Sequence, residues 1–203
     1  MSLLQPKMIL IDLDGTLVDS VPDLTYCVDA MMERLVRRAL IGRLDGEPDE
    51  TDYQRAYPIF LELYAENTFN RSQIYPGVRE GLEFMRDAGY PLGCVTNKAA
   101  RFTEPLLQHL GIHDFFGIVI SGDTLPRKKP DPLPLIHAAG HFGVKPEASL
   151  MIGDSVSDVN AARAAGFRII CTSYGYNHGV DIRESDPDAV IDSFVELREL
   201  LAS

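Results

Sequence analysis

The 203-residue chain has few cysteines and few basic residues, and each shortage argues against certain kinds of protein. Its three cysteines, Cys27, Cys94 and Cys171, lie far apart, and none belongs to a C-x-x-C pair. Because Cys94 and Cys171 lie in apolar runs typical of strands, we expect buried, unreactive thiols in a reducing cytoplasm rather than a disulfide framework. The 19 basic residues face 30 acidic ones, and the formal charge of −11 argues against nucleic acid or an anionic membrane as a partner.

Other signals are also missing. No apolar stretch approaches the ~20 residues that span a bilayer, and Asp12 and Asp14 interrupt the apolar N-terminal segment, so it does not resemble a signal peptide. The chain has no G-x-G-x-x-G and no Walker lysine loop, so nucleotide binding has no support. We therefore expect a cytoplasmic globular protein with no nucleic acid or membrane as a partner, and these features leave its oligomeric state, monomer or dimer, open.

From residue 75 onward, helix and strand signals alternate. Apolar spacing predicts helices at residues 78–88, 102–110, 133–142, 157–165 and 194–201, and short apolar runs predict strands at 91–96, 116–121, 150–153, 168–172 and 189–191. Together with the apolar run before Asp12, this order predicts an α/β fold, a Rossmann-like doubly wound parallel sheet. Such sheets bind ligands at the carboxyl ends of their strands.

Residues 21–74 do not alternate in this way. Helical apolar spacing at residues 24–36 and 51–68 predicts an all-helical segment. We therefore expect two domains: a Rossmann-like core made of residues 1–20 and 75–203, and a small helical cap made of residues 21–74, inserted after the first strand.

Two carboxylates, Asp12 and Asp14, follow the first apolar run. Acids at the tip of a hydrophobic strand are costly to desolvate, so a partner must compensate them. A hard divalent cation such as Mg²⁺ suits carboxylate oxygens, and the alternative is a solvated acidic turn.

Thr96, Asn97 and Lys129 follow later strands. A hydroxyl followed by backbone N–H groups suits a phosphate oxygen, but Thr96 and Asn97 are equally typical of a helix N-cap. Lys129, which Pro130 restrains, can deliver positive charge to carboxylates or to a phosphate.

The last polar cluster comprises Asp154, Ser155 and Asp158. Ser155 and Asp158 have the spacing of a helix capping box. Asp154 remains at the strand tip, where it can converge with Asp12 and Asp14 on one Mg²⁺ ion.

In this order, the motifs Asp12-x-Asp14-Gly-Thr, Thr96, Lys129-Pro and Gly-Asp154-Ser-x-x-Asp158 resemble the haloacid dehalogenase superfamily of phosphotransferases. The resemblance covers essentially the whole chain. Residues 12–24 and 173–179 further resemble the branch with a helical, C1-type cap that hydrolyses 2-phosphoglycolate.

The resemblance implies a Mg²⁺-dependent phosphomonoester hydrolase. Asp12 would attack phosphorus to form an aspartyl phosphate, and Asp14 would protonate the leaving alkoxide and later activate water. Thr96, Asn97 and Lys129 would bind the substrate's phosphoryl group. The implied metal ligands are Asp12, Asp14, Asp154 and Asp158, of which Asp158 either ligates the ion or supports its ligands.

Several alternatives stay open. The same chemistry could act on a sugar phosphate or serve a phosphomutase, since cap residues select the leaving group. Response-regulator receivers also place acids, a Thr/Ser and a Lys on a parallel sheet, but they lack a helical insertion after the first strand. A catalytically idle scaffold is a third alternative. Near Arg34–Leu35 the cap lacks a segment that is usual in the branch, so either the cap is shortened or this sequence omits a segment.

Overall fold

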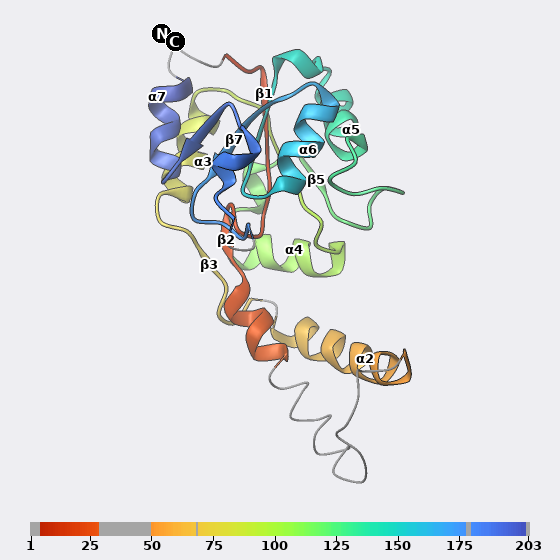
Figure 1. Ribbon diagram of the computed structural model, residues 1–203. Coiled ribbons are helices and arrows are strands. Elements are labelled where there is room, and N and C mark those ends of the chain that lie inside the picture. Colours follow the sequence, from red (N-terminus) through yellow and green to blue (C-terminus); the bar gives the residue numbers. More distant parts are fainter. Residues whose placement is uncertain (1–4, 29–49, 68, 178–179, 202–203) are drawn as a thin grey trace. The chain divides into compact units, whose positions relative to one another are not determined.

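The computed structural model of the chain describes residues 5–28, 50–67, 69–177 and 180–201 (Figure 1). The chain divides into two compact units, one made of residues 1–19 and 74–203 and the other of residues 20–73. Among the described residues, no helix has the length and apolar character needed to cross a membrane.

Six parallel strands form the sheet of the larger unit, in the order β5-β4-β1-β6-β7-β8. The strands β6, β7 and β8 lie on one side of β1, and β4 and β5 lie on its other side. This reversal of strand order around β1 confirms the predicted doubly wound parallel sheet. The strands are β1 (Met8–Ile11), β4 (Leu92–Val95), β5 (Ile118–Ile120), β6 (Ser149–Gly153), β7 (Arg168–Thr172) and β8 (Ala189–Ile191).

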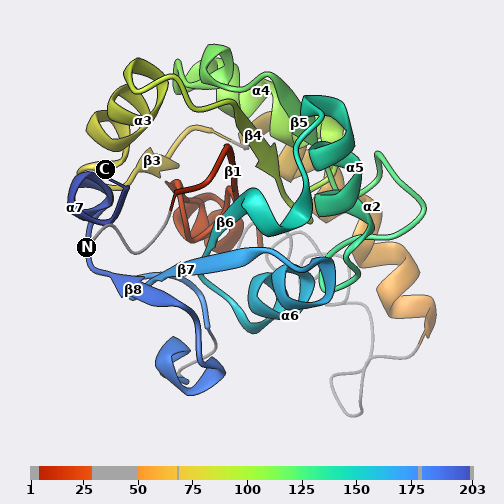
Figure 2. The same ribbon diagram turned by 90° about the horizontal axis from the view of Figure 1, so that it is seen from above.

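Helices cover both faces of this sheet (Figure 2). On one face lie α5 (Leu133–Phe142) and α6 (Val156–Ala165), and on the other lie α3 (Val78–Asp87) and α7 (Leu197–Leu201). All four residues of β1 are fully buried, because the sheet is covered on both faces, and this is why its strands are continuous apolar runs. Cys94 and Cys171 are buried free thiols, as predicted, and burial raises the pKa of both.

The observed boundaries of α5, β7 and β8 agree with the predicted ones, and most other boundaries shift by one or two residues. One helix differs more. Its predicted start, Phe194–Glu196, is a 3₁₀ turn, because Glu196 accepts the N–H groups of Asp192 and Ser193 before α7 begins.

The smaller unit is helical at residues 21–28 and along α2 (Glu50–Asn67). The predicted helix at residues 24–36 continues past the described residues, and the Arg34–Leu35 junction lies outside them. The prediction of an all-helical segment is wrong at its end, where β3 (Gln73–Ile74) pairs with β2 (Val18–Asp19). Pairing satisfies backbone groups of two segments that are distant in the sequence, which local spacing cannot reveal.

Within the smaller unit, the buried carboxylate of Asp23 joins the first helix to the end of the segment. It accepts the N–H of Arg71 at 2.9 Å, and from Ser72 it accepts the N–H at 2.8 Å and the hydroxyl at 2.6 Å. Three donors on one buried carboxylate make Asp23 a main structural anchor of residues 20–73.

Replacing Asp23 by Ala leaves these donors without their acceptor, so we expect the opening free energy of this unit to fall by about 2–3 kcal/mol. Hydrogen exchange at the Arg71 and Ser72 amides measures this loss. The matched control is Asp87→Ala, because the Asp87 side chain is 68% exposed on α3. Equal protection of the two amides in both variants would contradict the anchor.

Candidate active site

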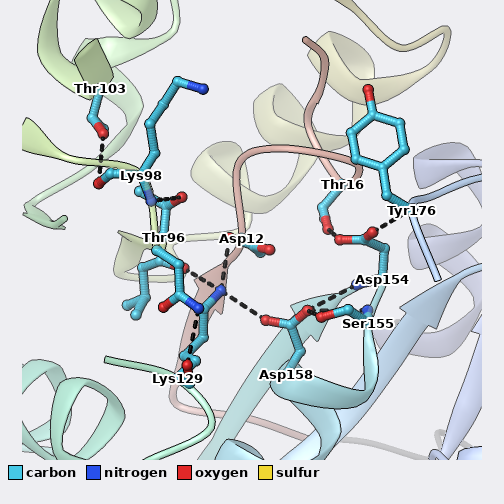
Figure 3. Close-up of polar contacts among 12 residues, drawn as sticks. Asp12, Thr16, Thr96, Lys98, Thr103, Lys129, Asp154, Ser155, Asp158 and Tyr176 are labelled. Atoms are coloured by element: carbon cyan, nitrogen blue, oxygen red, sulfur yellow. Dashed lines mark hydrogen bonds and ion pairs between the residues drawn. The ribbon is translucent and has the colours of Figure 1, made fainter. Parts of the chain in front are cut away.

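The candidate site lies where β1, β4 and β6 end (Figure 3). Asp12 follows β1, Thr96 follows β4, and Asp154 follows β6. Because β4 and β6 flank β1, these three tips adjoin one another at the point where the strand order reverses. The sequence signals at separate strand ends are thus brought together by the sheet.

Three buried carboxylates gather at these tips. Asp12 is 8%, Asp154 2% and Asp158 0% exposed. Each offers one oxygen, and these oxygens all lie within 4.8 Å of one another, which makes them the acidic group among the described residues that could hold one cation. The carboxylate of Asp14 is not part of this group.

The ammonium group of Lys129 is the partner of two of these acids. Its Nζ lies 2.7 Å from Asp12 Oδ1 and 2.7 Å from Asp158 Oδ1, and it donates to the carbonyl of Val95 at 2.7 Å. The amide of Asn97 donates to the Lys129 carbonyl at 2.9 Å, so this side chain holds the lysine loop in place.

The carboxylate of Asp158 makes two kinds of contact: it caps a helix, and it forms an ion pair with Lys129. Its Oδ2 accepts the N–H and the hydroxyl of Ser155, which confirms the predicted capping box at the start of α6. Its Oδ1 contacts Lys129. With both oxygens engaged, Asp158 fixes Lys129 relative to the start of α6.

Asp154 is held from two sides. Its Oδ1 accepts the hydroxyl of Thr16 at 2.8 Å, and its Oδ2 accepts the backbone N–H of Tyr176 at 2.6 Å. Two glycines allow this approach. A Cβ on Gly15, whose φ is +84°, would lie 2.3 Å from Asp154 Oδ2, and one on Gly175 would lie 2.1 Å from Asp154 Cβ.

Thr96 does not cap a helix. The helix α4 (Ala100–His109) has Ala99 as its N-cap, so the alternative based on Thr96 and Asn97 is wrong in register. The buried Thr96 oxygen instead accepts the N–H of Lys98 at 3.1 Å. This turn keeps the Thr96 hydroxyl near the tip of β4.

Asp14 forms an ion pair that the sequence motifs did not indicate. Its Oδ1 lies 2.9 Å from Nζ of Lys98, and the Lys98 side chain is only 7% exposed. Lys98 directly follows the polar Thr96–Asn97 pair after a strand, which was the one signal that could have identified it. The contact of Tyr176 with Asp154 had no comparable signal, because it is made by a backbone N–H.

Excess negative charge governs the electrostatics of the cluster. Burial raises the pKa of Asp154 to about 6, with Asp158 adding to the effect. Burial, together with Asp158 and Asp154, also raises the pKa of Asp12 against the opposing effect of Lys129. Burial alone would lower the pKa of Lys129, but Asp12 and Asp158 outweigh it and raise that pKa, so the lysine stays charged.

The donor set fits a hard divalent cation. Asp12, Asp154 and Asp158 present oxygens only, and one ammonium offsets three carboxylates. Carboxylate oxygens without sulfur or imidazole are typical of Mg²⁺ sites. The cluster can therefore hold such a cation next to Asp12.

Comparisons with known proteins agree with this geometry. The haloacid dehalogenase-like hydrolase family matches residues 6–166. A phosphoglycolate phosphatase of Nitrosococcus oceani is 61% identical over 98% of this chain and 97% of its own length, and one of Nitrosospira multiformis is 44% identical over 96% and 95%. The crystal structure of a predicted phosphoglycolate phosphatase from Haemophilus somnus superposes with a TM-score of 0.88 at 32% identity, covering 98% of this chain and 99% of that one.

The raised pKa of Asp154 predicts how stability depends on pH without metal. The folded protein holds this proton up to about pH 6, whereas the unfolded chain releases it near 3.8. The folded state therefore binds more protons in this window, and stability falls as pH rises through it, by on the order of 3 kcal/mol. Urea unfolding in EDTA, compared with Asp154→Asn, isolates this group. A stability difference between the two proteins that does not change from pH 4 to 7 would contradict the assignment.

Proposed function

Because the chain belongs to the haloacid dehalogenase-like hydrolase family, we propose that it hydrolyses 2-phosphoglycolate to glycolate and phosphate through Asp12. The observation that carries the proposal is the position of Asp12 at the end of β1, next to Lys129 and two further acids. The names of relatives at 61% and 44% identity over nearly the full length support the substrate. Family membership rules out the signalling-receiver alternative.

Asp12 is suited to nucleophilic attack. Lys129 holds Oδ1 at 2.7 Å, which orients the carboxylate and leaves its second oxygen to attack phosphorus. The bond from phosphorus to the glycolate oxygen breaks, and an aspartyl phosphate forms on Asp12. Water then attacks this phosphorus, the bond to Asp12 breaks, and phosphate leaves.

Asp14 is suited to the proton transfers of both steps. It lies two residues beyond Asp12, outside the buried acidic group, and 26% of its side chain is exposed. We assign it the proton that the departing alkoxide takes up and, afterwards, the proton that the attacking water gives up. Its side-chain contact with Lys98 does not support direct metal ligation.

The phosphoryl group needs positive charge and donors. Lys129 supplies an ammonium, and Thr96 supplies a hydroxyl at the tip of β4. The amide of Asn97 already donates to the Lys129 carbonyl, so its proposed contribution to substrate binding acts through the lysine loop.

We propose Mg²⁺ as the cofactor, held by Asp12 and Asp154. When bound, the ion supplies positive charge that offsets the repulsion between the acids and a phosphate dianion. Asp158 supports the ion's surroundings by fixing Lys129, because its Oδ1 contacts that ammonium while its Oδ2 accepts the Ser155 hydroxyl. The free, buried cysteines are consistent with a reducing cytoplasm, which we propose as the compartment.

Asp12→Asn removes the nucleophile with little change in shape, so we expect phosphate release from 2-phosphoglycolate to fall more than about 10³-fold. EDTA should abolish release by the wild type, and added Mg²⁺ should restore it. The same chemical change at the exposed Asp87 is the control and should leave turnover unchanged. The assay is phosphate release across 2-phosphoglycolate and a panel of sugar phosphates. Faster release from a sugar phosphate would move the substrate assignment, and an active Asp12→Asn enzyme would refute the mechanism.

Asp14→Asn separates the two steps. With p-nitrophenyl phosphate, whose leaving group needs no proton, Asp12 can still be phosphorylated, but water attack on the intermediate lacks its base. We expect a burst of about one nitrophenolate per site followed by slow turnover, measured by stopped-flow absorbance. Steady-state turnover as fast as that of the wild type would show that Asp14 does not serve the second step, and slow release without a burst would place its effect in the phosphorylation of Asp12 instead.

A further inference from the structure

The ion pair between Lys98, whose side chain is largely buried, and Asp14 has no place in the steps described above. Lys98 Nζ lies 2.9 Å from Asp14 Oδ1, and its side chain is 7% exposed. A long, flexible side chain loses several rotamers when it is held in this way, so its placement has an entropic cost. Surface lysines are normally solvated, which makes this one unusual.

The backbone of Lys98 is fixed on three sides. Its N–H donates to the hydroxyl of Thr96 at 3.1 Å, and its carbonyl accepts the N–H of Gly122 at 2.8 Å and the hydroxyl of Thr103 at 3.3 Å. The side chain therefore starts from a rigid point directly beside the proposed phosphoryl ligand, Thr96. From this position, the Lys98 ammonium can reach a substrate group that is bonded close to the phosphoryl group.

The ammonium groups of the two lysines, Lys98 and Lys129, lie at different positions in the site. Lys129 ends between Asp12 and Asp158, whereas the Lys98 side chain points away from that ammonium (Figure 3). Lys129 is thus placed to contact the reacting phosphoryl group. Lys98 ends instead at Asp14, the residue to which we assign the leaving oxygen, so it faces the departing part of the substrate.

We propose that Lys98 binds the carboxylate of the substrate and thereby selects an anionic leaving group, an inference that rests on the proposed function. One methylene group separates the bridging oxygen from the carboxylate carbon in 2-phosphoglycolate, so a carboxylate follows directly where the leaving oxygen meets Asp14. An ammonium can exchange one carboxylate partner for another and so stays paired itself. In this exchange the substrate takes over Lys98, and the carboxyl group of Asp14, which is 26% exposed, turns toward the leaving oxygen with the proton that it transfers there.

A series of leaving groups that differ in charge tests this assignment. Values of kcat/KM are measured for 2-phosphoglycolate, ethyl phosphate and phosphoethanolamine, which present a carboxylate, a methyl group and an ammonium at similar positions. The enzymes are the Mg²⁺-loaded wild type, Lys98→Met and Lys98→Arg. Lys128→Met is the matched control, because Lys128 is exposed on the loop beside Lys129.

We expect the wild type to prefer the carboxylate, then the methyl group, then the ammonium. Lys98→Met should reduce the ratio of kcat/KM for 2-phosphoglycolate over ethyl phosphate by about 10- to 100-fold, the range of a charge-assisted hydrogen bond. Lys98→Arg should retain most of this ratio, and Lys128→Met all of it. Glycolate should lose its competitive inhibition in Lys98→Met.

An unchanged ratio in Lys98→Met, or an equal loss with all three substrates, would overturn the inference and leave Lys98 as a support for Asp14. If Lys98→Met is unstable by thermal unfolding, the ratio in Lys98→Gln decides the question. If the wild type hydrolyses ethyl phosphate as fast as it hydrolyses 2-phosphoglycolate, recognition of the carboxylate is refuted, while the proposed phosphatase activity stands. Failure of the wild type on all three substrates would instead refute the proposed function.

Discussion

An excess of buried negative charge is the constraint on which the rest of this structure depends. Asp12, Asp154 and Asp158 lie within 4.8 Å of one another, and Lys129 is the ammonium that contacts two of them. Like charges at this separation repel strongly when water is excluded. Protons or a bound cation would relieve this repulsion, and the proposed chemistry uses that need. A cation bound there would also make the site attractive to a phosphate.

The fold maintains this charge by fixing each acid separately. Asp12 and Asp154 are delivered by adjacent parallel strands, and Thr16 with the Tyr176 backbone holds Asp154 against relaxation. The lack of a side chain at Gly15 and Gly175 lets these segments approach the carboxylate. Asp158 is fixed because it also closes the first turn of α6. The cluster is therefore preorganised. The sheet, one helix and two turns each hold part of it in place against the repulsion between the carboxylates.

The parts that the sequence predicted are those determined by local pattern. Continuous apolar runs predicted the buried parallel strands, and the Ser155–Asp158 spacing predicted a capping box that the structure contains. The convergence of Asp12 and Asp154 followed from the rule that strand ends meet at one edge. Other contacts depend on segments far apart in the chain. The pairing of Lys98 with Asp14, the Tyr176 N–H on Asp154 and the strand pair β2-β3 have no periodic signal, so only the folded structure reveals them. The roles assigned to the individual site residues stay predictions.

The most direct test of the central claim is the binding of inorganic phosphate, the product, to the wild-type protein with and without Mg²⁺. Isothermal titration calorimetry at pH 7.5 measures both affinities under matched ionic strength. We predict no measurable binding without the ion and clear one-to-one binding with it, because the uncompensated acids repel the anion. Equal phosphate affinity in EDTA and in Mg²⁺ would show that Lys129 and the backbone alone offset the acids, and would contradict the account of the site as an acidic cluster completed by a cation.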